Sequence, residues 1–84
     1  MLTNKTIDAL NALHDKAENV YGPIGDNYRG FAALRSEYLE VEHAFQGRDY
    51  DRLRDELMDL ANVATRWAQA IDSGEVAQYV RAGE

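Results

Sequence analysis

Three stretches of the chain have an apolar residue at every third or fourth position. Short segments without this spacing lie between them. Such spacing places side chains on one face of an α-helix, so each stretch is predicted to be an amphipathic helix. The first two helices are expected over residues 3–20 and 28–46. The third is expected to follow Asp49, a good N-cap, and to end at Ser73 and Gly74. The predicted apolar stripes are, helix by helix, Ile7, Leu10, Leu13, Ala17 and Val20; Phe31, Leu34, Tyr38, Val41 and Phe45; and Leu53, Leu57, Leu60, Ala64, Trp67 and Ile71.

Two kinds of connection separate these helices. Within residues 21–27, two glycines and a proline interrupt the periodicity, and Asp26 or Asn27 is available to cap the next helix. The turn at residues 47–49 has the sequence Gly-Arg-Asp and is very short. A turn of this length makes the second and third helices antiparallel neighbours.

The predicted fold class is all-α, because no segment alternates apolar and polar residues as a half-buried strand does. We expect a single helical domain over residues 1–84, with an antiparallel hairpin as its core, flanked by the first helix and a short fourth helix within 75–82. The stripes on the two long helices are too extensive for the first helix alone to cover. A second copy is therefore expected to complete a four-helix bundle, as a homodimer or a homotetramer.

The composition narrows the class of protein further. A domain of 84 residues hides only about 60 to 65% of the surface that its unfolded chain exposes, which favours self-association. The absence of cysteine excludes disulfides and thiolate metal sites such as zinc fingers, and is compatible with the reducing cytoplasm, the expected location. Neither a membrane span nor a signal peptide is indicated, because apolar runs are short and the first twenty residues are charged.

Fifteen acidic residues against nine basic ones give a net charge of −6. This balance disfavours binding to a nucleic acid, whose affinity for proteins comes largely from lysine and arginine replacing counterions. A free nucleotide that carries a divalent cation is a different ligand, since acidic side chains attract the cation.

A short pattern occurs twice in the predicted hairpin. The segment LRSEYLE at residues 34–40 matches LRDELMD at 53–59, so each long helix carries two acids three residues apart in the same register against its apolar stripe. An antiparallel hairpin can bring these flanks together within one chain or across a dimer interface. The four acids are Glu37, Glu40, Glu56 and Asp59.

Four converging carboxylates repel one another unless a cation lies between them. A set of oxygen ligands without histidine or cysteine suits Mg²⁺, with Mn²⁺ as a second possibility. These acids are followed at the fourth position by apolar residues rather than by the bases that are common on a solvated helix face. The alternative is that an acidic protein shows two such pairs by coincidence and that all four acids are solvated.

The acidic pairs resemble the motif of the MazG-like all-α nucleoside triphosphate pyrophosphohydrolases, which carry ExxE on one helix and ExxD on the next. The similarity covers roughly residues 21–72 and includes DELMDLANVA at 55–64. The loop YGPIGDNYRG at 21–30 is most similar to phage and prophage members, some of which have no established activity. Many members have an extra acid where this chain has Ser36, so one accessory carboxylate is missing.

The resemblance implies Mg²⁺-dependent hydrolysis between the α and β phosphates of a (deoxy)nucleoside triphosphate, giving a monophosphate and pyrophosphate. The four acids would hold the metal, and Glu37 or Glu40 would act as the catalytic base. Asn62 and Arg66 are the candidate substrate contacts, although each is also an ordinary choice for a polar helix flank. The alternatives are a catalytically inactive MazG-like nucleotide-binding protein and a helical protein-interaction module.

Overall fold

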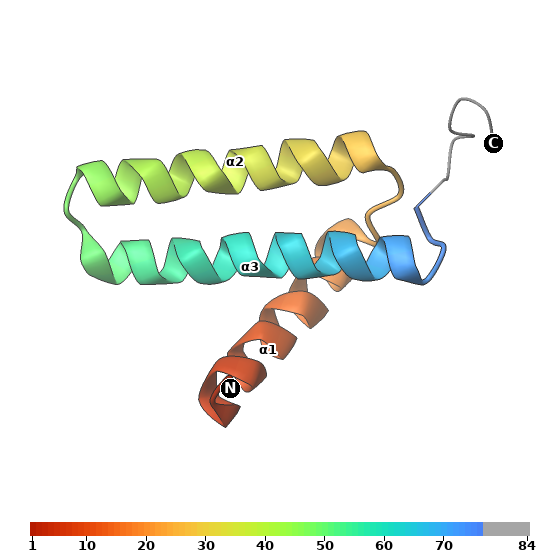
Figure 1. Cartoon of the computed structure of the whole chain (residues 1–84), viewed down its shortest axis with the longest axis horizontal. Helices are drawn as coiled ribbons and strands as arrows, with labels where there is room; N and C mark the ends of the chain where they lie inside the picture. Colours follow the sequence, from red (N-terminus) through yellow and green to blue (C-terminus); the bar gives the residue numbers. More distant parts are fainter. Residues whose placement is uncertain (77–84) are drawn as a thin grey trace.

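The computed structural model describes residues 1–76 and shows three α-helices: α1 (Asn4–Tyr21), α2 (Asn27–Gln46) and α3 (Tyr50–Asp72) (Figure 1). No strand occurs in this part of the chain, so the predicted all-α class and the three long helices are confirmed. The helix bounds agree with the predicted ones to within about one residue. The predicted fourth helix falls mainly on residues 77–84, which lie outside the described residues.

Each helix begins at a side chain that caps its free backbone amides. Thr3 accepts a hydrogen bond from the Thr6 amide, and Asp26 accepts one of 2.7 Å from the Arg29 amide. Asp49, predicted as the cap of the third helix, accepts a bond of 3.2 Å from the Arg52 amide. Such caps satisfy donors that the first helical turn leaves unpaired, at about 1 kcal/mol each.

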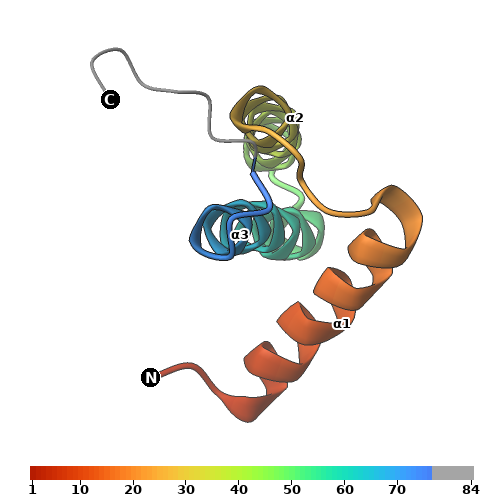
Figure 2. The same cartoon turned by 90° about the vertical axis from the view of Figure 1, so that its right-hand side faces the viewer.

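Helices α2 and α3 form the predicted antiparallel hairpin and pack along their length, whereas α1 crosses α3 obliquely (Figures 1 and 2). The backbones of α1 and α3 are in contact, but those of α1 and α2 are not. The second view shows α1 diverging from the hairpin on one side (Figure 2). One face of the hairpin is thus partly covered by α1. None of the three helices combines the length and hydropathy that crossing a membrane requires.

The connection between α2 and α3 turns sharply at Arg48, whose φ is 56°. The Asp49 amide donates to the Ala44 carbonyl and the Gly47 amide to the His43 carbonyl, which closes the last turn of α2. A positive φ in a residue other than glycine is uncommon and occurs mostly in tight turns of this kind.

The core is small and lies where the loop before α2 meets the end of α3. Ile24, Ala70 and Val76 are buried together, and Trp67 packs against them. The Trp67 indole Nε1 donates a 2.8 Å hydrogen bond to Asn27 Oδ1. Trp67 was predicted to be a core residue and is partly buried at this position.

Gly30 allows this close approach of Trp67 to α2. A Cβ atom on Gly30 would lie 2.5 Å from two atoms of the indole ring, closer than real Cβ atoms approach a neighbour. Replacing Gly30 with alanine is therefore expected to displace Trp67 and to lower the free energy of unfolding by about 1 to 2 kcal/mol. Urea unfolding followed by Trp67 fluorescence measures this change. The matched control is Gly25→Ala, where the nearest atom lies at 3.9 Å, and it should leave stability nearly unchanged.

Much of the predicted apolar stripes lies uncovered. On α2, Phe31 is 58% exposed, Tyr38 54% and Phe45 64%. On α3, Leu57 is 47% exposed and Ile71 42%. Ala44 on α2 and Val63 on α3, which lie outside the predicted stripes, are buried instead. Exposed apolar area of this extent is typical of an interaction surface.

Candidate divalent-cation site

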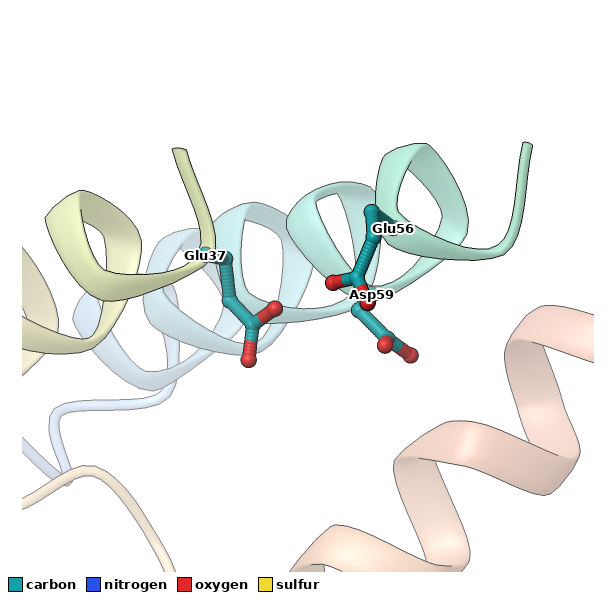
Figure 3. A group of neighbouring side chains, drawn as sticks. All are labelled: Glu37, Glu56 and Asp59. Atoms are coloured by element: carbon teal, nitrogen blue, oxygen red, sulfur yellow. The ribbon is translucent and has the colours of Figure 1, made fainter. Parts of the chain in front are cut away.

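Three of the four predicted acids meet on one face of the hairpin. Glu37 extends from α2, and Glu56 and Asp59 extend from α3 one turn apart (Figure 3). One carboxylate oxygen from each residue can be chosen so that all three lie within 4.8 Å of one another. The three carboxylates point to the side of the hairpin on which α1 lies (Figure 3). The matching register of the two acidic pairs therefore produces the predicted convergence for these three residues.

Glu40, the fourth predicted acid, is bound by Arg52 instead of joining the other three. Its Oε2 atom accepts a 2.7 Å hydrogen bond from the Arg52 guanidinium, and the side chain is 46% exposed. The Nε atom of Arg52 lies 3.7 Å from Glu56 Oε1, so this arginine faces two of the four acids. Glu40 is thus not among the three converging carboxylates. Arg52 lies one turn before Glu56 on α3, and its side chain extends across the hairpin to Glu40 on α2.

Two of the converging acids, Glu37 and Asp59, lie in an environment that disfavours their charge. Burial raises the pKa of Glu37, and repulsion from Asp59, Glu56 and Glu40 raises it further. Burial also raises the pKa of Asp59, with repulsion from Asp55 adding to the rise and the Lys16 ammonium opposing it. Both shifts have the direction expected of carboxylates that crowd together in a partly desolvated place.

The raised pKa values make the metal-free protein less stable as pH increases. Glu37 binds its proton more tightly in the folded than in the unfolded chain, so stability falls as pH rises from the ordinary value of 4.5 through the raised pKa. Glu37→Gln removes this loss. In the presence of a chelator, we expect the variant to melt above the parent at neutral pH and the two melting curves to converge at pH well below 4.5. A difference that does not change with pH would contradict this origin of the effect.

A hollow of about 330 Å³ lies beside the acids, between α1 and the hairpin. Glu37, Asp59, Asn62 and Arg66 line it from the hairpin, and residues of α1 including Lys16 line it from the other side. The sequence predicted the acids and the two polar residues and left the role of the first helix open. Lys16 was not among the predicted site residues, and its only signal is its position next to the buried stripe residue Ala17.

Asn62 is buried, with 7% of its surface exposed. Its Nδ2 atom donates a long hydrogen bond of 3.4 Å to the Leu13 carbonyl of α1. Its Oδ1 atom is buried and has no hydrogen-bond partner among the described residues. A buried amide oxygen without a donor costs about 1 to 3 kcal/mol, so such an atom indicates a place for a ligand or a water molecule.

Arg66 is equally buried and already has partners. Its Nε atom lies 3.3 Å from Glu18 Oε1, and its NH2 group donates a 2.8 Å hydrogen bond to the Gly22 carbonyl. Both partners lie at the C-terminal end of α1, so Arg66 fixes that end of the helix against α3. The residue lines the hollow as predicted for a phosphate contact, but its charge is largely balanced by Glu18.

This arrangement suits a hard cation. Three carboxylates from two rigid helices supply oxygen ligands, and Mg²⁺ typically uses only one or two protein carboxylates together with water and phosphate oxygens. A site on one chain therefore leaves coordination positions open toward the hollow. The donor set contains no nitrogen or sulfur ligand of the kind that Zn²⁺ prefers.

Comparison with known proteins gives no relative: no family model matches the chain, and no curated protein or solved structure matches it significantly. The resemblance to the MazG-like enzymes therefore stays a prediction from the acidic motif.

Proposed function

We propose that the protein binds a divalent cation, Mg²⁺ or Mn²⁺, through Glu37, Glu56 and Asp59 and uses it to hydrolyse a nucleoside triphosphate to a monophosphate and pyrophosphate. The observation that carries the proposal is that one oxygen from each of three carboxylates lies within 4.8 Å of the others beside a hollow lined by Asn62, whose side-chain oxygen has no partner among the described residues. Crowded acids with raised pKa values need a positive charge, and a cation supplies it.

The bound metal would neutralise the phosphate charge, which is the main requirement of phosphoryl transfer. The chain supplies the proton acceptor. Glu37 and Glu40 are the candidates, and Glu37 is favoured because Arg52 occupies Glu40. In the proposed step, a water oxygen bonds to the α phosphorus, the water proton passes to the carboxylate, and pyrophosphate leaves.

The remaining polar residues would orient the substrate. Asn62 Oδ1 can accept a hydrogen bond from a hydroxyl, an amino group or a water molecule of the bound ligand. Arg66 would act mainly by holding α1 in place, because its partners are Glu18 and Gly22. A second hollow of about 340 Å³ adjoins the first, and both are lined by Tyr21 and Glu37. It offers room for the part of a nucleotide that extends beyond its phosphates.

A second candidate function is a helical interaction module, which the exposed apolar surface favours. Phe31, Tyr38 and Phe45 are spaced by seven residues on α2, as are Tyr50, Leu57, Ala64 and Ile71 on α3, and all seven are exposed. A seven-residue period is that of helices packing side by side in bundles. We propose that this apolar stripe, which lies about 100° from Glu37 on α2 and about 100° from Glu56 on α3, joins two copies of the chain into a four-helix bundle.

Measuring hydrolysis of nucleoside triphosphates distinguishes the enzyme from a binding protein and from an interaction module. Ordinary and damaged nucleoside triphosphates are incubated with the protein in Mg²⁺, and released pyrophosphate is measured, with chelator and Glu56→Gln as controls. Hydrolysis that needs both Mg²⁺ and Glu56 supports the enzyme. Metal-dependent binding without release of pyrophosphate would instead support a catalytically inactive nucleotide-binding protein. Absence of both binding and a thermal shift with Mg²⁺ or Mn²⁺ would leave the interaction module.

A further inference from the structure

Lys16 lies between two adjoining hollows on the side of α1 that faces the hairpin. One hollow of about 330 Å³ contains Glu37, Asp59 and Asn62, and another of about 380 Å³ contains Arg54, Asp55 and Asp59. Lys16 and Asp59 line both. The side chain is exposed, so its ammonium group is available to a ligand that enters from solvent.

The charge of Lys16 is not taken up by an ion pair. None of the ion pairs formed within residues 1–76 includes it, and its influence on Asp59 is the electrostatic one that opposes the rise in that residue's pKa. The other cation of the first hollow, Arg66, is bound by Glu18 and the Gly22 carbonyl. The wall of the site therefore carries one positive charge that is free to meet an anion.

We propose that Lys16 is an anion contact that binds a phosphate oxygen of the ligand held between α1 and the hairpin, next to the cation. This inference rests on the proposed function and adds to it a role for α1. The same hollow is lined by Asn62, which is 7% exposed and whose side-chain oxygen has no partner among the described residues, and this is the independent sign that a ligand belongs there. A lysine ammonium is a compact point charge with three donors, and it is a common partner of phosphate in proteins.

Loss of the Lys16 charge should affect binding of the cation and binding of the phosphate anion in opposite directions. The Lys16 charge repels a cation that binds Asp59 and attracts the anion that binds the cation. Removing the charge should leave affinity for the bare metal unchanged or slightly higher. It should lower affinity for a phosphate ligand about 10-fold, the loss expected for one charge-assisted hydrogen bond. A lysine that only balances the acids, without touching a ligand, would not weaken anion binding.

The test uses the full chain and two calorimetric titrations. Mn²⁺ is titrated alone, and a nucleoside triphosphate with a non-hydrolysable α,β-methylene bridge is titrated in saturating Mg²⁺. The variants are Lys16→Gln, Lys16→Arg, which keeps the charge, and Lys5→Gln, the control for loss of one charge on the same helix outside both hollows. Melting curves establish that each variant is folded.

The expected result is that only Lys16→Gln weakens binding of the analogue, by about 10-fold, while its Mn²⁺ affinity is at least that of the parent. If Lys5→Gln weakened binding of the analogue equally, the effect would be one of general charge, and the proposed contact would be wrong. Unchanged binding of the analogue by Lys16→Gln would also overturn the contact. A parent protein that binds Mn²⁺ but no analogue overturns this inference and the nucleotide part of the proposed function, but not the cation site, whereas analogue binding that is unchanged in Lys16→Gln overturns this inference alone. A parent protein that binds no divalent cation overturns the proposed function and this inference together.

Discussion

Replacing Asp59 with asparagine is expected to abolish the rise in melting temperature that Mg²⁺ produces and, at the same time, to raise the melting temperature of the metal-free protein. Asp59 is one of three converging acids and its carboxyl pKa is raised, so its charge destabilises the fold until a cation binds. Loss of a ligand should weaken metal binding by at least about 100-fold, since substitutions of residues around metal ligands already cost 10 to 100-fold.

The measurement is thermal unfolding in chelator and across a series of Mg²⁺ concentrations. For the parent, saturation at 100 times the Kd adds about 2.7 kcal/mol of stability. The control is Asp15→Asn, which removes the same charge from an exposed position on α1. It should keep the full response to Mg²⁺. Equal responses of parent and Asp59→Asn to Mg²⁺ would contradict the assignment of Asp59 as a ligand.

Glu40 provides an internal comparison among the four predicted acids. Because Arg52 holds its carboxylate at 2.7 Å, we expect Glu40→Gln to weaken metal binding much less than Asp59→Asn. The same titration ranks the two variants.

The second large effect is expected on self-association. A glutamate in place of Tyr38 or Leu57 introduces a charge into the exposed apolar stripe. Each substitution is present twice in a two-fold interface, once in each copy. We expect the dissociation constant of the dimer to rise by at least about 100-fold, as for an interface hot spot. Sedimentation velocity over a range of concentrations measures the change. The expected pattern is a dimer for the parent and a monomer for either variant.

Leu39→Glu is the matched control, since Leu39 is 44% exposed on α2 beside Tyr38 but lies about 100° away from the stripe. It should remain a dimer. A parent chain that sediments as a monomer at all concentrations would contradict the proposed assembly, without bearing on the cation site of a single chain.

The sequence predicted the helices well because their signals are local. Spacings of three and four define the apolar stripes, and Asp26 and Asp49 cap the helices that follow them. The convergence of Glu37, Glu56 and Asp59 could also be predicted, since an antiparallel hairpin can bring together two acidic pairs that lie in one register on its helices.

What could not be predicted depends on packing between helices. The ion pair of Arg52 with Glu40 spans the hairpin, and helical periodicity does not determine which long side chain crosses it. The burial of Asn62 and Arg66 follows from the path of α1, whose crossing of α3 has no signal in a periodic stripe. For the same reason the sequence left open the role of the first helix and of its Lys16.

The central claim is that one divalent cation binds to the carboxylates of Glu37, Glu56 and Asp59. Anomalous diffraction from crystals grown with Mn²⁺ locates such an ion without reference to activity. We expect a single strong peak within coordination distance of all three carboxylates, on the face of the hairpin beside α1. Absence of a peak there at saturating Mn²⁺, with the three side chains directed separately into solvent, would contradict it.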